Sequence, residues 1–251
     1  MSNMPSWIRQ SFVRGILTTR YPREVATENE VPPTGRPPIP VDGSSSSAAG
    51  VSSCPVGAIT ETAVDQGKCI RCARCLPAGF AFTGSVESAT RYREELLHIS
   101  AGPASEAASA TPLAGFGRSL HVFMVDVGSC NACNLEVFAL ANPFYDSQRL
   151  GIFFTNSPRH ADVLLVVGVP TAEMVEPLHR AYDALPAPKA VVAVGACPIS
   201  GGVFAGTPGI AGTLADLLPV DVFVPGCPPT PLGILDGLLK LTGRNRTCRE
   251  V

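Results

Sequence analysis

Runs of apolar residues alternate with amphipathic stretches through the second half of the chain. Apolar runs predict strands at 121–127, 151–155, 162–168, 189–195 and 221–226, and the stretches between and after them predict helices over 133–142, 172–185 and 231–242. Continuous β-branched runs separated by helices are typical of a buried, mostly parallel sheet. The pattern therefore predicts an α/β domain over 119–251, with helices on both faces of the sheet.

The first half of the chain has a different pattern. Residues 7–18 place apolar side chains at near-helical spacing with arginines among them, which predicts a short basic amphipathic helix. Such a helix packs on protein or lies in a membrane interface, and both interpretations stay open. The stretch 21–53 is rich in Pro, Gly and Ser, so 1–53 is expected to be this helix and an extended arm. Small, turn-rich residues make 99–118 a linker.

The composition of the chain bears on its partners, its location and the role of its cysteines. A net charge of -2 with 16% charged residues gives no electrostatic footprint for nucleic acid. Every apolar run is shorter than the ~18–20 residues that span a bilayer, and 45% hydrophobic content suggests a large permanent partner. No secretory leader is evident, so a cytoplasmic location is expected. In a reducing compartment, nine cysteines are expected to be metal ligands or reactive thiols.

The first group of cysteines is compact. Cys69, Cys72 and Cys75 form a C-x2-C-x2-C run, and Cys54 is followed directly by Pro55. Such loops present three thiolates to one 4Fe-4S cluster, while the fourth ligand comes from a distant Cys-Pro. Zinc also needs four ligands, but its sites usually show two C-x2-C pairs. The spacing favours a 4Fe-4S cluster, with zinc as the alternative.

This stretch resembles the bacterial two-cluster ferredoxins. Each half of such a ferredoxin carries C-x2-C-x2-C-x3-C-P, with the fourth cysteine ligating the other cluster. Ser44, Ser47, Gly50 and Gly79 stand where four of the cysteines are expected, and Phe80 replaces the usual proline. The missing four are the complete ligand set of one cluster. The resemblance therefore implies a small ferredoxin-like α+β domain over 54–98 with one cluster kept and one deleted.

The second group combines three loops. Cys130 and Cys133 form a C-x2-C pair, Cys197 lies in a Gly-Ala-Cys-Pro segment, and Cys227 lies in a Pro-Gly-Cys-Pro segment. Sites in parallel sheets gather outside the carboxyl ends of strands, where three of these cysteines are expected. Nearby glycines let the backbone approach closely. Four thiolates from three loops fit a second 4Fe-4S cluster.

With SPRHADVLLVVGVPT between them, these motifs resemble the small electron-transfer subunit of group 4 membrane-bound nickel-iron hydrogenases of the formate hydrogenlyase type. The same family includes the 20-kDa-type subunit of complex I. The resemblance covers about 119–242, and the expected fold class is a flavodoxin-like α/β sheet. Complex I subunits characteristically have adjacent cysteines at the first position, so the C-x2-C pair favours the hydrogenase branch.

The front of the chain, including TTRYP at 18–22, looks like the ferredoxin-type subunit of the same complexes. The chain is therefore interpreted as a fusion of two subunits. The resemblance implies a catalytic large subunit, of the hydrogenase or complex I 49-kDa type, and membrane subunits as partners. It also implies a peripheral location on the cytoplasmic side of the inner membrane.

Several other residues are candidates. Glu136 is implicated in proton passage by the resemblance, or is an ordinary acidic residue near a helix start. Asp126, Arg159 and His160 are expected at the interface with the large subunit, although His160 also fits a simple helix start. Cys248 is expected to be a free thiol. The glycine-rich stretch 201–212 lacks a nucleotide-binding motif, so no nucleotide is expected.

The sequence thus predicts a non-catalytic electron-transfer subunit with two 4Fe-4S clusters in a membrane-associated oxidoreductase. A complex I-like subunit that passes electrons to quinone is one alternative. A zinc-stabilised interaction module without redox chemistry is the other.

Overall fold

The computed structural model describes residues 18–24, 36–40, 48–83, 86–99 and 112–244. The helix expected over 7–18, apart from its last residue, lies outside these ranges, as do much of the arm and linker and Cys248. Within the described ranges, none of the helices has the length and apolar character needed to span a bilayer.

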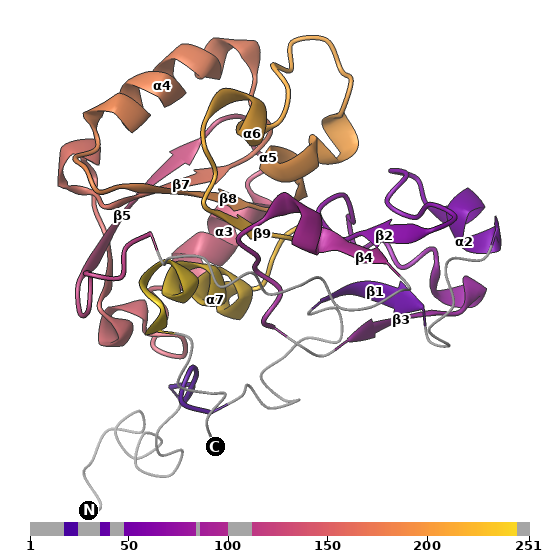
Figure 1. The fold of residues 1–251 in the computed structure, drawn as a ribbon, viewed down its shortest axis with the longest axis horizontal. Coiled ribbons are helices and arrows are strands. Elements are labelled where there is room, and N and C mark those ends of the chain that lie inside the picture. The colour runs from indigo at the N-terminus through magenta and orange to yellow at the C-terminus, as the bar shows by residue number, and fades with distance from the viewer. Residues whose placement is uncertain (1–17, 25–35, 41–47, 84–85, 100–111, 245–251) are drawn as a thin grey trace, which may run out of the picture.

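A five-stranded sheet forms the larger lobe (Figure 1). Its strands are β5 (Leu120–Asp126), β6 (Ile152–Phe154), β7 (Val163–Val167), β8 (Ala190–Val194) and β9 (Val222–Val224). All neighbouring strands are parallel, in the order β6-β5-β7-β8-β9. Numbered from β5, this order is 2-1-3-4-5, the flavodoxin-like arrangement. The α/β, mostly parallel fold expected from the sequence is confirmed.

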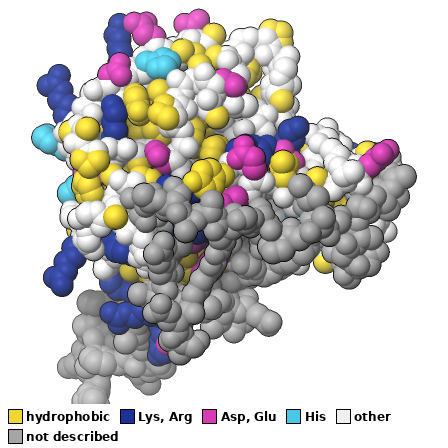
Figure 2. Space-filling model, viewed as in Figure 1, with side chains coloured by type: hydrophobic (Ala, Val, Ile, Leu, Met, Phe, Trp, Pro, Cys, Tyr) yellow, Lys and Arg dark blue, Asp and Glu magenta, His cyan; other side chains and the backbone are white. Residues whose placement is uncertain are grey.

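Helices cover both faces of the sheet, which explains the uninterrupted apolar runs. All five residues of β7 and all five of β8 are buried. One face packs against α3 (Ala132–Ala139) and α7 (Pro231–Thr242). The other packs against α4 (Val175–Ala184), α5 (Ala196–Ser200) and α6 (Leu214–Leu217). Over α4, at the top of Figure 2, acidic and basic side chains are interspersed.

Short 3-10 turns complete the described structure. They are η1 (Leu76–Ala78), η2 (Arg93–Leu96), η3 (Ser147–Leu150), η4 (Pro158–His160), η5 (Ala172–Met174) and η6 (Gly202–Phe204). The helix expected over 172–185 is split into η5 and α4, because Pro177 has no N–H to donate to the carbonyl of residue 173. Likewise α3 ends at Ala139, short of the expected 142, since Pro143 disfavours helix in the residue before it.

The smaller lobe consists of two antiparallel strand pairs. Strand β1 (Arg36–Pro40) pairs with β3 (Phe80–Thr83), and β2 (Ala63–Asp65) pairs with β4 (Leu97–Ile99). Helix α2 (Ala48–Ser53) leads into Cys54. A small core holds this lobe together, and its buried members are Ile59, Val64, Cys75 and Phe80.

The smaller lobe packs against β9, the edge strand of the large sheet. Thr90 forms an antiparallel bridge with Phe223 of β9, its N–H donating to the Phe223 carbonyl at 2.9 Å and its carbonyl accepting at 2.8 Å. Nearby, the Ser200 hydroxyl donates to the Gly67 carbonyl at 3.1 Å. The edge of β9 is therefore partly covered within the chain, and the two lobes share backbone hydrogen bonds.

Asp236 of α7 is a buried anchor for segments distant in sequence. It is 1% exposed and accepts hydrogen bonds from the Tyr21 hydroxyl (3.3 Å), the Ala89 N–H (3.3 Å) and the Lys240 ammonium (2.9 Å). Burial raises the pKa of Asp236, while the charge of Lys240 lowers it. Through this carboxylate, α7 holds both the N-terminal arm at Tyr21 and the segment around Ala89.

Replacing Asp236 with Ala is expected to destabilise the fold by about 3–5 kcal/mol, since it removes the buried carboxylate that pairs with Lys240 and accepts hydrogen bonds from Tyr21 and Ala89. Urea unfolding followed by circular dichroism measures this loss. Glu176→Ala is the matched control, because it also breaks an i, i+4 pair, with Arg180, in which both side chains are more than 70% exposed. The control should cost less than about 1 kcal/mol. Equal losses would contradict the anchoring role.

Candidate cluster-binding sites

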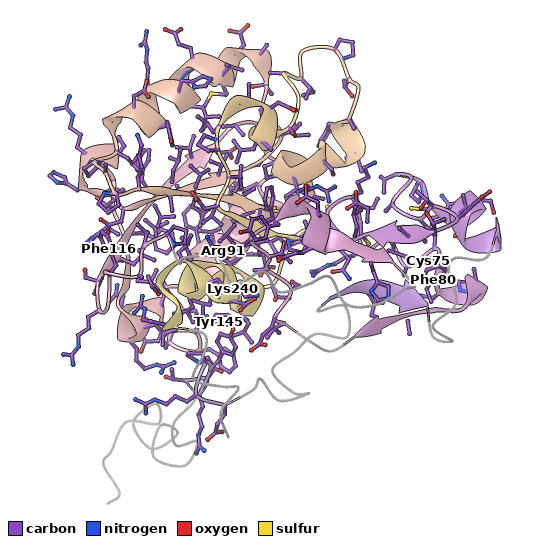
Figure 3. All side chains as sticks on the ribbon, in the orientation of Figure 1. Cys75, Phe80, Arg91, Phe116, Tyr145 and Lys240 are labelled. Atoms are coloured by element: carbon purple, nitrogen blue, oxygen red, sulfur yellow. The ribbon has the colours of Figure 1, made fainter. Side chains whose placement is uncertain are left out.

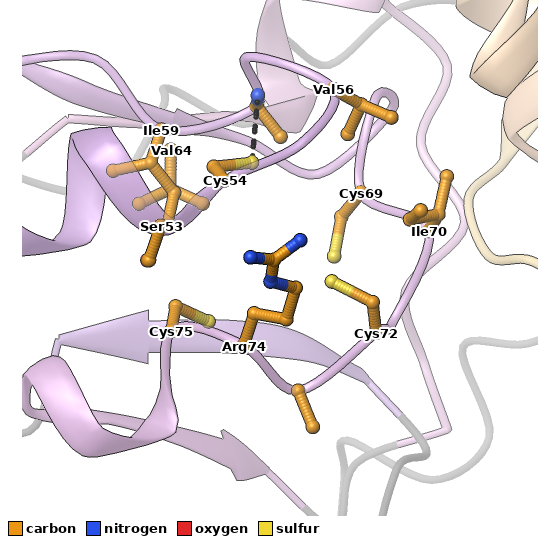
Figure 4. Close-up of a pocket in the computed structure, with 12 residues that line it drawn as sticks. Ser53, Cys54, Val56, Ile59, Val64, Cys69, Ile70, Cys72, Arg74 and Cys75 are labelled. Atoms are coloured by element: carbon orange, nitrogen blue, oxygen red, sulfur yellow. Dashed lines mark hydrogen bonds between the residues drawn. The ribbon is translucent and has the colours of Figure 1, made fainter.

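Four thiols surround a pocket in the smaller lobe. Cys54 follows α2, and Cys69, Cys72 and Cys75 come from one loop that ends at η1. All four line the pocket, and Figure 4 shows their sulfur atoms facing the space between the loops. The remaining lining is mostly apolar, from Val56, Ala58, Ile59, Val64, Ile70 and Ala73, with Ser53 and Arg74. The pocket therefore presents four soft ligands within a weakly polar wall.

Backbone N–H groups point at the sulfur atoms of this pocket. The Ala58 N–H donates to Cys54 Sγ at 3.2 Å, and the Arg71 N–H donates to Cys69 Sγ at 3.4 Å. Burial raises the pKa of the Cys69 thiol to about 11, and negative charge at Cys75 and Cys54 adds to the rise. Metal binding must therefore displace protons from these thiols, and the N–H donors favour the thiolate form.

The loop of the first site has a left-handed backbone at two positions. Arg71 and Ala73 have φ of 55° and 63°, values that non-glycine residues rarely adopt. The two residues flank Cys72, so successive cysteines of the run turn toward a common centre. Strain of this kind persists where the surroundings hold it, and is common at functional sites.

The second set of thiols lies at the carboxyl end of the large sheet. Cys130 follows β5, Cys133 is in the first turn of α3, Cys197 is in α5 just after β8, and Cys227 follows β9. Burial raises the pKa of the Cys133 thiol to about 12, with further rises from the charges of Cys197, Cys227 and Cys130 in that order. The structure therefore brings all four cysteines of the second set together.

Two glycines make room for the sulfur atoms of this set. A Cβ added at Gly195, which has φ of 97°, would lie 2.7 Å from Cys133 Sγ. A Cβ added at Gly202 would lie 3.1 Å from Cys197 Sγ. Side chains at 195 and 202 would thus fill the space beside the thiols, which explains the glycines that precede and follow Cys197 in the sequence.

Asp126 organises the loop that carries Cys130. Its carboxylate accepts hydrogen bonds from the Gly128 N–H, the Ser129 N–H and hydroxyl, and the Asn134 amide, at 2.6–2.9 Å. Burial alone would raise the pKa of Asp126, but these hydrogen bonds hold it below its usual value. Asp126 was expected at a subunit interface, and the structure gives it a role in fixing this loop.

Arg71 joins the two sites, although no motif in the sequence singles it out. Its guanidinium donates to the carbonyls of Pro228 at 3.2 Å and Pro225 at 3.3 Å, on either side of Cys227. Arg71 itself lies between Cys69 and Cys72 of the first set. One side chain therefore links the loop of one thiol set to the loop of the other.

Of the other candidates, Glu136 lies beside the second site, whereas Arg159 and His160 precede β7 and lie toward the amino end of β5. Glu136 is half-buried on α3, where burial raises its pKa and the charge of Arg71 lowers it. Arg159 and His160 lie on η4, and neither side chain is buried. In the described ranges, no three His, Cys, Asp or Glu side chains converge closely enough to hold a single metal ion.

Both sites have the chemistry that a 4Fe-4S cluster requires. Each offers four thiols from loops, with N–H donors or glycine-lined space beside the sulfur atoms. Together with the flavodoxin-like sheet, they define an α/β protein of two lobes with one four-cysteine site in each.

Comparison with known proteins identifies the family. Residues 130–241 match the model of the NADH ubiquinone oxidoreductase 20 Kd subunit family. A probable membrane-bound hydrogenase subunit mbhJ of Pyrococcus furiosus is 49% identical over 123 residues, which are 49% of this chain and 74% of that protein. Formate hydrogenlyase subunit 7 of Escherichia coli is 44% identical over 126 residues, 50% of this chain and 49% of that protein.

Two further matches are also chains of multi-subunit enzymes. A subunit of the F(420)H(2) dehydrogenase of Methanosarcina mazei is 40% identical over 133 residues, 53% of this chain and 71% of that protein. A chain of the archaeal membrane-bound sulfane sulfur reductase is 32% identical with a TM-score of 0.47, covering 54% of this chain and 75% of that one. The chain belongs to the NADH ubiquinone oxidoreductase 20 Kd subunit family, whose members named above are subunits of oxidoreductase complexes.

Proposed function

We propose that the chain is an electron-transfer subunit that holds two 4Fe-4S clusters. Cys54, Cys69, Cys72 and Cys75 would hold one, and Cys130, Cys133, Cys197 and Cys227 the other. The observation that carries the proposal is the presence of two complete four-thiol sites in lobes that are joined through Arg71. When bound, each cluster supplies one-electron redox chemistry.

The residues around each site suit the binding of a cluster. The wall of the first pocket is mostly apolar, and the N–H donors to Cys54 and Cys69 stabilise negative charge on sulfur. In the second site, Asp126 fixes the loop before Cys133, and Gly195 and Gly202 leave space beside the thiols. The chain would hold and orient its clusters while a partner subunit performs the chemistry.

Exposed apolar side chains beside the second site support a large partner. Leu135 and Phe138 of α3 are each 61% exposed, and Val203 and Phe204 of η6 are 56% and 37% exposed. The first two follow Cys133 in the chain, and the other two follow Gly202. Exposed apolar residues are typical of protein interfaces. We assign these residues to contacts with the catalytic large subunit, with Glu136 of α3 as the candidate for proton passage.

The hydrogenase branch is the preferred assembly. The C-x2-C pair at Cys130 and Cys133 and the relatives named for hydrogenase and formate hydrogenlyase support it. The chain would then be a peripheral subunit on the cytoplasmic side of the membrane, next to the membrane subunits of the complex. Its smaller lobe would be a ferredoxin-type subunit fused to the family domain, with one cluster kept.

Iron and sulfide analysis of the anaerobically purified chain tests the proposal. About eight iron atoms per chain are expected, since two clusters carry four each. Reduction with dithionite should give two electron paramagnetic resonance signals that titrate separately. Zinc in place of iron would favour an interaction module instead, and about four irons would leave only one of the two sites as a cluster site.

A further inference from the structure

We propose that Arg71 is a positioning residue shared by the two sites, which braces their loops together and stabilises added negative charge at both. The inference rests on the proposed function, because it concerns two clusters that are loaded at the same time. It adds a residue that belongs to neither ligand set. Arg71 forms no bond during reduction and keeps its proton, and the added electron comes from an external reductant.

The hydrogen bonds of Arg71 hold it across the boundary between the lobes. Its two terminal nitrogens donate to the carbonyls of Pro228 and Pro225, so the planar guanidinium is hydrogen-bonded to the backbone on both sides of Cys227. A Cβ added at Gly226 would lie 2.6 Å from the Pro229 backbone and 2.8 Å from one of these nitrogens. Glycine at 226 therefore leaves room both for the turn to Pro229 and for the guanidinium.

The third nitrogen of the guanidinium, Nε, is buried and has no acceptor among the residues that the structure describes. A buried N–H without an acceptor costs about 1–3 kcal/mol, so it calls for a partner. Sulfur atoms of a loaded site would supply one, since iron–sulfur clusters accept N–H hydrogen bonds that tune their potential.

The charges around Arg71 come from both sites. Burial lowers the pKa of Arg71, while negative charge at Cys69, Cys227, Glu136 and Cys133 raises it. Cys69 belongs to the first set, and Cys227 and Cys133 belong to the second. A fixed positive charge in a weakly polar setting interacts strongly with its neighbours, so it favours the reduced and more negative form of each site.

Arg74 provides a matched comparison in the same loop. It occupies the corresponding position of the next C-x2-C step and is more exposed than Arg71, and Figure 4 shows its guanidinium among the four thiols of the first pocket. Water therefore screens the charge of Arg74 more than that of Arg71, which is half-buried and contacts the Cys227 loop directly. An effect on the reduction of both clusters is therefore expected when the charge of Arg71 is removed, and not when the charge of Arg74 is removed.

Redox titration of the full chain, monitored by electron paramagnetic resonance, tests the inference. Arg71→Gln is expected to lower the reduction equilibrium constant of both clusters about tenfold, which is about 59 mV for one electron. Arg71→Lys, which keeps the charge, should stay within about threefold of the original for both clusters. Arg74→Gln should leave the potential of the Cys130/Cys133/Cys197/Cys227 cluster unchanged.

The outcomes separate this inference from the function it rests on. Fewer than two clusters in the unaltered chain would overturn the proposed function and this inference with it. Two clusters with a shift at only one of them in Arg71→Gln would overturn the shared role alone. If Arg71→Gln does not retain iron, the Arg71→Lys variant provides the test. A tenfold decrease in the reduction equilibrium constants of the clusters in Arg71→Lys, which keeps the charge, would overturn the charge effect.

Discussion

Replacing Cys72 with Ala is expected to lower the iron content from about eight to about four atoms per chain, because a four-iron cluster needs all its thiolates. Cys72 is exposed, so its loss changes packing less than loss of the buried Cys69 or Cys75. One of the two paramagnetic signals should disappear, and the other should keep its shape. Iron, sulfide and electron paramagnetic resonance measurements on the purified variant check this result.

Two other cysteine variants sharpen this test. Cys197→Ala should remove the signal that Cys72→Ala retains, since the two residues belong to different lobes. Cys248→Ala, which changes a cysteine outside both sets, should keep all the iron. Loss of both signals in Cys72→Ala would mean that the two sites do not load independently, and unchanged iron would exclude Cys72 as a ligand.

Restoring the second cluster of a two-cluster ferredoxin, which would be the third cluster of this chain, is expected to require removal of the Phe80 ring. Ser44, Ser47, Gly50 and Gly79 stand where a second ferredoxin cluster would have its ligands. Phe80 is 4% exposed and packs beside Cys75 (Figure 3), and a Cβ added at Gly50 would lie 2.5 Å from its ring. Cysteines at the four positions should therefore gain about four irons only when Phe80→Pro is added.

The controls separate the ring from the ligands. The fourfold variant that keeps Phe80 should hold about eight irons, because the buried ring obstructs the third ligand at 50. Phe80→Pro alone removes a buried aromatic side chain and should cost about 3–5 kcal/mol of stability in unfolding experiments. If the variant with the four added cysteines gains four irons while Phe80 is still present, the ring does not obstruct the ligand at position 50.

The larger lobe was largely predictable from the sequence. The apolar runs at 162–168 and 189–195 became the fully buried β7 and β8, since only a sheet covered on both faces needs such runs. The helix expected over 231–242 has the observed bounds, with Thr230 accepting the Gly233 N–H at its start and Gly243 left-handed at its end. Periodicity does not encode which strands are neighbours, so the strand order was expected only through the resemblance to a flavodoxin-like fold.

The grouping of cysteines was also predictable, whereas the link between the groups was not. Spacing alone separated the two sets, and the carboxyl ends of β5, β8 and β9 bring the second together. Arg71 and Arg74 occupy equivalent positions in the C-x2-C-x2-C run, so nothing in the sequence shows which of the two arginines contacts the Cys227 loop. That distinction depends on how the lobes dock, through contacts between residues more than 150 positions apart.

The bridge between Thr90 and Phe223 has a consequence for assembly. Because the smaller lobe is hydrogen-bonded to the edge of β9 and belongs to the same chain, the two four-thiol sites occur in a fixed one-to-one ratio. Dilution separates carriers that are held only by association, but it leaves an intramolecular pair together. The spacing of the two sites is thus independent of protein concentration, and loss of every other subunit would leave the pair intact.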